Sequence, residues 1–194
     1  GAGRGAGADN AQYAAAQAVV SRALEVPRDL DGHKIPAFRW KGVPVSNHVG
    51  IAEALYLRGK ICRLLGDFEE SKLMTESCLN IRKDLFGRKS VPVSEALFEL
   101  ADFHATTGIL AEALALHVVA LDIRRQFLLG SEQGHPLVAD SMLAVGGIKI
   151  MLSRLGEGRS MLTQVVTMRE TLYGADSAQY AEAQLSNVLA MLQQ

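Results

Sequence analysis

The sequence has only two cysteines, Cys62 and Cys78, among 194 residues. Two cysteines do not make a disulfide framework, and a chain of this length does not need one to stabilise its core. They predict reduced thiols in a cytosolic type of compartment. No run of about eighteen apolar residues occurs, so we expect no membrane insertion.

An excess of charge of either sign is also lacking, since Lys and Arg total 20 and Asp and Glu total 21. A nucleic-acid or anionic-membrane footprint needs a basic excess or a basic face, so the balance argues against both kinds of partner. The chain begins with Gly rather than Met. We expect it to be part of a longer protein.

Motifs that carry chemistry are equally scarce. Zinc ligands come in tight pairs, whereas Cys62, Cys78, His104 and His117 are scattered and fall on packing positions. No Ser-His-Asp order, phosphate loop or paired-carboxylate motif stands out. We therefore expect no catalytic residue, no cofactor and no metal in this chain, which is not predicted to be an enzyme.

A phrase that occurs three times is the main positive signal. It reads "LNIRKDLFG" at 79–87, "LDIRRQFLLG" at 121–130 and "VTMRETLYG" at 166–174. The arginines of the three copies, Arg82, Arg124 and Arg169, are separated by 42 and 45 residues. A fixed period of this size indicates a repeat architecture, in which each copy is one supersecondary unit.

Each copy has the pattern of two amphipathic helices. In the first copy, residues 51–65 and 68–86 place apolar side chains at helical spacing, and Gly66 interrupts them. Asp67 is a good N-cap for the second helix, and Gly87 is typical of a helix end. Short turns between such helices predict antiparallel hairpins that stack on one another. The fold class is therefore all-α, an α-solenoid.

Small residues recur at three positions of each copy, where two helix axes are expected to come closest. The columns are Gly59, Ala101 and Gly146; Ser71, Ala113 and Gly158; and Cys78, Ala120 and Val165. This spacing resembles the tetratricopeptide repeat (TPR). The long second helix, the repeated phrase and the connector "GSEQGHPLVA" resemble the TPR type of kinesin light chains and nephrocystin-like proteins. The resemblance implies a right-handed TPR superhelix.

The predicted segments cover the whole chain. They are a Gly/Ala-rich tail at 1–8, a helix of a partial repeat at 9–26, an irregular Pro-containing connector at 27–48, TPR 1 at 49–92, TPR 2 at 93–136, TPR 3 at 137–179 and a half-repeat helix at 180–194. Two interpretations of Phe38 and Trp40 in the connector stay open. They either anchor a partner or pack on the first repeat.

The first helices of a TPR array line its concave face, so the alignment predicts which residues a partner contacts. These partner-binding candidates are Glu53, Tyr56, Lys60, Arg63, Glu95, Phe98, Asp102, Asp140, Leu143, Ile150, Glu182 and Leu185. The acidic column of Glu53, Glu95, Asp140 and Glu182 predicts an acidic lip. The apolar column of Tyr56, Phe98, Leu143 and Leu185 predicts an apolar floor below it, so the groove suits a basic and apolar segment. Alternatively, the acids only stabilise the N-terminal ends of their helices.

Two functions of different class follow. The first is a protein–protein interaction scaffold that binds a protein or peptide segment in the concave groove, as a subunit of a larger complex. The second is the regulatory TPR arm of an enzyme or signalling ATPase whose catalytic domain lies outside these residues. The resemblance implies a cytoplasmic setting in a cytoskeletal or ciliary assembly. The floor lacks the Asn residues that clamp a peptide backbone in kinesin-light-chain-like repeats, which favours a more apolar partner.

Overall fold

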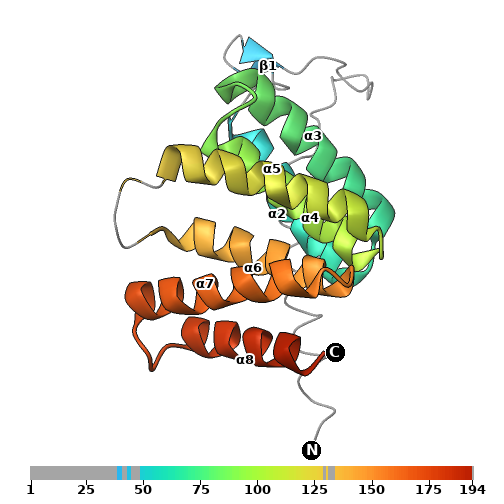
Figure 1. Cartoon of the computed structure of the whole chain (residues 1–194). Coiled ribbons are helices and arrows are strands. Elements are labelled where there is room, and N and C mark those ends of the chain that lie inside the picture. The colour runs from blue at the N-terminus through green and yellow to red at the C-terminus, as the bar shows by residue number, and fades with distance from the viewer. Residues whose placement is uncertain (1–38, 41–42, 45–48, 129, 131–133, 194) are drawn as a thin grey trace, which may run out of the picture. The chain divides into compact units, whose positions relative to one another are not determined.

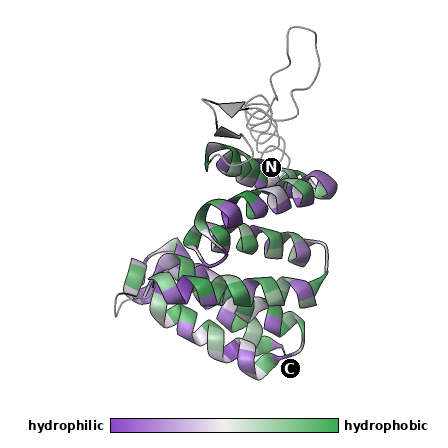
Figure 2. Cartoon of the chain, turned by 90° about the horizontal axis from the view of Figure 1, so that it is seen from above, coloured by the Kyte–Doolittle hydropathy of each residue, from purple (hydrophilic) through white to green (hydrophobic). Residues whose placement is uncertain are grey.

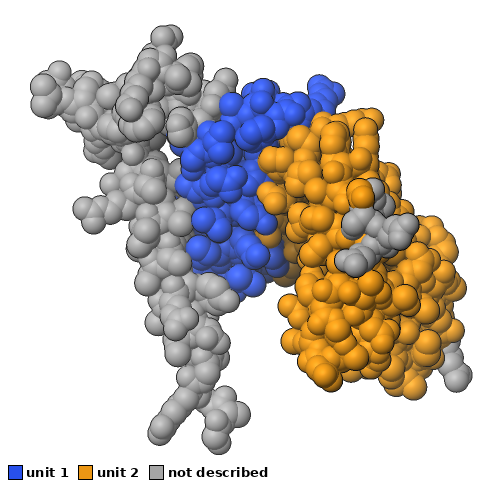
Figure 3. All heavy atoms as spheres, turned by 90° about the vertical axis from the view of Figure 1, so that its left-hand side faces the viewer, with its two compact units in different colours: residues 1–88 blue, residues 89–194 orange. Residues whose placement is uncertain are grey.

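The computed structural model describes residues 39–40, 43–44, 49–128, 130 and 134–193. The chain divides into two compact units, residues 1–88 and 89–194, which are coloured blue and orange in Figure 3. The predicted tail at 1–8 and the predicted helix at 9–26 lie outside the described residues. None of the helices in the described part is long and apolar enough to cross a bilayer.

Unit 1 contains a helical hairpin formed by α2 (Val49–Leu65) and α3 (Phe68–Phe86) (Figure 1). The bounds of α3 are those expected for the second helix of the first repeat, and α2 begins two residues earlier than expected. The connector expected to be irregular contains a short antiparallel pair, β1 (Arg39–Trp40) and β2 (Val43–Pro44). The side chains of this pair lie outside the described residues, so both interpretations of Trp40 stay predictions.

Unit 2 is a stack of helices in which each packs on the next in chain order, and α6 also contacts α8. The helices are α4 (Val91–Thr106), α5 (Leu110–Leu128), α6 (Pro136–Met151), α7 (Leu155–Tyr173) and α8 (Ala178–Leu192). In Figure 1, α6, α7 and α8 run side by side. The prediction of an all-α repeat of stacked hairpins is therefore confirmed.

The turn inside each hairpin needs one residue with positive φ. Gly66 and Gly108 take φ of 83° and 81°, and Ser153 occupies the aligned position in the third repeat with φ of 61°. Only Gly adopts this conformation without a steric cost from Cβ. The predicted N-cap forms, because the Asp67 carboxylate accepts a hydrogen bond from the Glu70 N–H at 3.3 Å. The turn chemistry predicted from the sequence is thus present.

The helix ends differ in detail from the expectation. Gly87 and Gly174 follow α3 and α7 with φ of 78° and 82°, but their ψ values are 164° and 162°. This is the extended region at positive φ rather than the left-handed helical one, and it is also essentially restricted to Gly. In the connector, His135 caps α6, because its Nδ1 accepts a hydrogen bond from the Leu137 N–H at 3.1 Å.

The small-residue columns lie where paired helices approach most closely. A Cβ at Gly59 would lie 2.4 Å from the hydroxyl oxygen of Thr75, and one at Gly158 would lie 2.9 Å from the backbone oxygen of Gly146. Ala101 and Ala113 are fully buried. Side chains larger than these would separate the helices, so the columns are a steric requirement of the hairpin.

The core of unit 2 is shared among its helices. One cluster joins Leu121 of α5, Val138 and Met142 of α6, Val165 of α7 and Ala183 of α8. Figure 2 shows that each helix carries apolar residues on part of its surface and polar ones on the rest. Because every helix completes a core begun by its neighbours, the helices of unit 2 stabilise one another.

Candidate partner-binding surface

The arginine of the repeated phrase is buried in all three copies. Arg82, Arg124 and Arg169 have exposed fractions of 0%, 3% and 3%. A guanidinium cannot lose its charge in a protein, so a buried one must have hydrogen-bonding partners. The partners of these arginines come from the first helices of the repeats.

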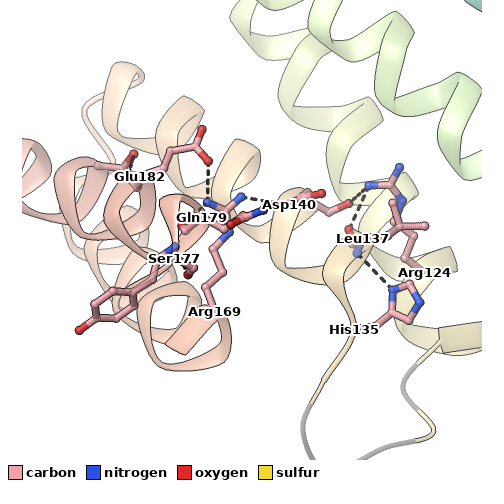
Figure 4. A network of polar contacts seen from close by, with 11 residues as sticks. Arg124, His135, Leu137, Asp140, Arg169, Ser177, Gln179 and Glu182 are labelled. Atoms are coloured by element: carbon pink, nitrogen blue, oxygen red, sulfur yellow. Dashed lines mark hydrogen bonds and ion pairs between the residues drawn. The ribbon is translucent and has the colours of Figure 1, made fainter. Parts of the chain in front are cut away.

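Arg169 of α7 connects the two first helices that flank it (Figure 4). Its guanidinium donates to Asp140 Oδ1 of α6 at 2.8 Å and to Glu182 Oε2 of α8 at 2.7 Å. It also donates to the backbone oxygen of Gln179 at 2.8 Å. Although burial opposes its charge, the hydrogen bonds to the Glu182 and Asp140 carboxylates outweigh burial and raise the pKa of Arg169.

Arg124 of α5 makes the same connection through hydroxyl and backbone oxygens. It donates to the Ser94 hydroxyl of α4 at 3.3 Å, and in α6 to the Ser141 hydroxyl at 2.6 Å and the Leu137 backbone oxygen at 3.0 Å. Its Cζ lies 4.5 Å from the centre of the Phe98 ring. In unit 2 the arginine of the phrase therefore makes a polar link between successive hairpins.

In unit 1, the buried Arg82 makes contacts within its own hairpin. It donates to Glu53 Oε1 at 2.8 Å, and its Cζ lies 4.7 Å from the centre of the Tyr56 ring. Glu53 and Tyr56 both belong to α2, the first helix of the same hairpin. An aromatic ring of the first helix thus covers the buried guanidinium in the first two repeats.

These contacts change the interpretation of the acidic column. Glu53, Asp140 and Glu182, predicted as a lip that attracts basic partners, are ion-paired with the buried arginines. Their side chains are 51%, 43% and 61% exposed, so one side of each carboxylate still contacts water. The sequence pattern did not reveal this pairing, because the paired residues are 29 or 13 positions apart.

The residues of the apolar column differ in how exposed their side chains are. Tyr56, Phe98 and Leu143 are half-buried, whereas Leu185 is 60% exposed. Phe98 meets the ring of His117 edge to face at 4.6 Å, and Leu143 packs partly against the core of unit 2. In unit 2 the column therefore presents partly open apolar side chains on α4, α6 and α8.

The remaining partner-binding candidates differ in their exposure and in their contacts. Lys60 is exposed and Arg63 is half-buried on α2, and Glu95 is half-buried on α4. Asp102 faces the buried His117, with 3.3 Å between its Oδ1 and Nε2. Ile150 is a correction, because it is only 6% exposed. It packs with Leu162 and Ala190 in a core cluster and is not available to a partner.

A cluster that the sequence analysis missed lies at the turn of unit 1. Ligand-type atoms of Cys62, Asp67 and Glu70 lie within 4.8 Å of one another. Glu70 is ion-paired with Arg58 and accepts a contact from the Cys62 thiol at 3.6 Å, while Asp67 caps α3. The contacts that hold the hairpin together therefore account for the cluster.

The residue aligned with Glu70 has the same role in the third repeat. Glu157, which aligns with Glu70, accepts from Lys149 at 2.9 Å and from Arg154 at 2.8 Å. Hydrogen bonds from Arg154 and Lys149 lower the pKa of Glu157 to about 2. In both repeats a glutamate of the second helix thus joins cations at the turn, which is a structural role.

The thiol of Cys62 is expected to react slowly in the folded protein. Burial, followed by the negative charge of Glu70, raises the pKa of Cys62 from 9.0 to about 11. Because the thiolate is the reactive form, alkylation of Cys62 at pH 8 should be at least about 100-fold slower in the folded chain than in urea. Mass spectrometry after timed iodoacetamide labelling measures both rates. Equal rates in the two states would contradict this account of the site.

Comparison with known proteins finds no matching family model and no matching curated protein. Several solved structures do match. The nearly identical TPR-like repeats of a Podosopora anserina protein described as a kinesin light chain align with a TM-score of 0.64 at 15% identity, over 92% of this chain and 75% of theirs. Their Q17M variant gives 0.65 at 15% identity, over 92% and 74%.

BtubC (BKLC) from P. vanneervenii aligns with a TM-score of 0.65 at 15% identity, over 93% of this chain. The chain spans 63% of the length of that protein, less than two thirds. At such low identity these likenesses show the fold alone. The fold is therefore a TPR-like array of helical hairpins, of the kind found in kinesin light chain repeat structures.

Proposed function

We propose that this chain is a protein–protein interaction scaffold, and that a segment of a partner protein packs across the first helices of unit 2. The observation that carries the proposal is the column of Phe98, Leu143 and Leu185. These partly open apolar side chains lie at matching positions of α4, α6 and α8. Repeat arrays of this type present extended surfaces rather than closed, water-excluding sites, which favours binding over catalysis.

The electrostatics of the surface indicate an apolar anchor in the partner. Asp140 and Glu182 are ion-paired with Arg169, so their charges are largely compensated where a partner would contact them. A basic residue of the partner could reach only the exposed side of each carboxylate, whose charge the buried guanidinium already offsets. We therefore expect apolar side chains of the partner to supply most of the affinity, with basic residues contributing at the exposed edge.

We further propose that this scaffold belongs to a larger cytoplasmic assembly, cytoskeletal or ciliary. The likeness of its fold to kinesin light chain TPR-like repeats supports this proposal. The partner segment would lie along the groove as a helix or an extended strand.

Removing the central anchor should weaken partner capture. We expect Glu95→Lys combined with Phe98→Ala to lower the amount of partner recovered by cross-linking pull-down about tenfold or more, as for a central interface residue. Val119→Ala, a change at a 47% exposed residue of α5, is the matched control and should have no effect. Circular dichroism must show that both variants keep their helicity. Unchanged recovery from the folded double variant would show that a different face binds.

A further inference from the structure

Helix α8 carries more exposed large apolar side chains than any other helix in the described part of the chain. Five of its fifteen residues are large apolar side chains that are more than half exposed. The exposed fractions are 60% for Leu185, 52% for Val188, 52% for Leu189, 55% for Met191 and 73% for Leu192. Contiguous exposed apolar patches of this kind mark interaction sites. We call Leu185, Val188, Leu189 and Leu192 the α8 stripe.

The helix that carries the stripe is held in place at both ends. At its start, the Ser177 hydroxyl accepts from the Tyr180 N–H at 3.2 Å, and Arg169 binds Glu182. At its end, Arg159 of α7 donates to the Ala190 backbone oxygen at 2.9 Å and also binds the Gln193 backbone oxygen. The stripe is therefore presented on a fixed helix, which reduces the entropy lost when a partner binds.

The close helix–helix packing found inside the hairpins cannot form on the face of α8 that carries the stripe. Val188 occupies the position that Gly59, Ala101 and Gly146 hold in the three repeats. At Gly146 a Cβ would already lie 3.0 Å from Leu162 of the paired helix. A valine at that position would hold a second helix of the repeat type away from α8. Whatever covers the stripe must therefore pack against it side chain to side chain, at a wider spacing.

The spacing and charge of the stripe are those of a helix that pairs with a copy of itself. Ala181, Leu185, Val188 and Leu192 follow one another at intervals of four, three and four residues. This is the heptad pattern of a helix–helix seam. Along α8, which is described throughout, Glu182 is the only charged residue, and it is already paired with Arg169. Two such faces can meet without repulsion between like charges.

We propose that the α8 stripe binds the same stripe of a second copy of this chain, in an antiparallel helix pair with two-fold symmetry. The antiparallel direction places the two Glu182 side chains at opposite ends of the seam, far from each other. Val188 then lies near the symmetry axis, where residues of one copy meet the same residues of the other. One stripe alone makes a small interface, so we expect a dimer that dissociates in the micromolar range.

The proposal is tested on the 194-residue chain by sedimentation equilibrium at concentrations up to about 200 µM, where a weak interface of this size is populated. The wild-type chain should approach the mass of a dimer as concentration rises. Val188→Asp with Leu192→Asp should keep the monomer mass throughout, because the exposed positions tolerate charge in the monomer but not in the seam. Thr163→Asp with Gln164→Asp, on exposed positions of α7, should dimerise like the wild type.

Cross-linking tests the geometry separately. Val188→Cys should form a disulfide-linked dimer under mild oxidation, whereas Gln164→Cys, at an exposed position of α7, should not. A wild-type chain that stays monomeric over the whole range overturns the proposal, and so does a dimer that the double aspartate variant leaves intact. None of these variants changes Phe98, Leu143 or Leu185, so a failure of the dimer leaves the partner-binding proposal standing. Leu185 belongs to both surfaces, so a dimer would cover that end of the column.

Discussion

Replacing Arg124 by Met should lower the free energy of unfolding by about 3 kcal/mol, because leaving buried hydrogen-bond acceptors without a donor costs ~1–3 kcal/mol for each group. Met keeps much of the apolar stem and removes only the guanidinium. The hydroxyls of Ser94 and Ser141 and the backbone oxygen of Leu137 then lose their donor in the interior. The Phe98 ring also loses the cation that it covers.

Arg125→Met is the matched control, because Arg125 is the next residue of the same helix and is exposed. It should change stability by less than about 0.5 kcal/mol, as surface substitutions usually do. Urea unfolding followed by circular dichroism compares the two variants. If both lose the same small amount, Arg124 does not link α4 to α6, and the repeated phrase needs another explanation.

Replacing Gly158 by Leu should destabilise unit 2 by roughly 3 kcal/mol or more, the upper range for overpacking. A Cβ at this position would lie 2.6 Å from Cδ1 of Ile150 and 2.9 Å from the backbone oxygen of Gly146. The side chain of Ile150 can turn aside, but the backbone of α6 can yield only if the two helices separate. Separation would also open the cluster of Ile150, Leu162 and Ala190.

Gly156→Leu isolates the steric effect from helix propensity, because Gly156 lies two residues earlier in α7 with no atom within 4 Å of an added Cβ. Leu is the better helix former, so this variant should gain up to about 1 kcal/mol. Thermal unfolding should therefore move in opposite directions for the two variants. A Gly158→Leu protein as stable as the wild type would mean that α6 and α7 are not in close contact.

The hairpins were predictable from the sequence because their determinants are local. Gly66 and Asp67 end one helix and begin the next within two residues, and α2 ends and α3 begins where expected. The repeat made this inference stronger, since Gly108 has the same turn role one period later. Propensity, capping and turn geometry all act over a few residues, so a linear pattern records them.

The candidate site was less predictable, because its residues meet across helices. The acidic column was correctly aligned, yet its pairing with buried arginines depends on contacts such as that between Glu53 and Arg82, 29 positions apart. Ile150 was placed on the surface by alignment, but its side chain fills the space beside Gly158. A pattern of residue types does not state which side of a helix its neighbours cover.

The sequence alone specified an all-α array of hairpins, through its repeat period, its turn residues and its columns of small side chains. The steric and conformational limits behind these signals act on each residue regardless of its tertiary contacts. Only the packed helices show that the arginines lie in the interior and that the carboxylates pair with them. Whether a charge is buried depends on distant segments of the chain that exclude water around it. The exposure of the α8 stripe was likewise decided by tertiary packing. Its valine in a small-residue position was visible in the sequence, but only the packing shows that no helix of the described residues covers it.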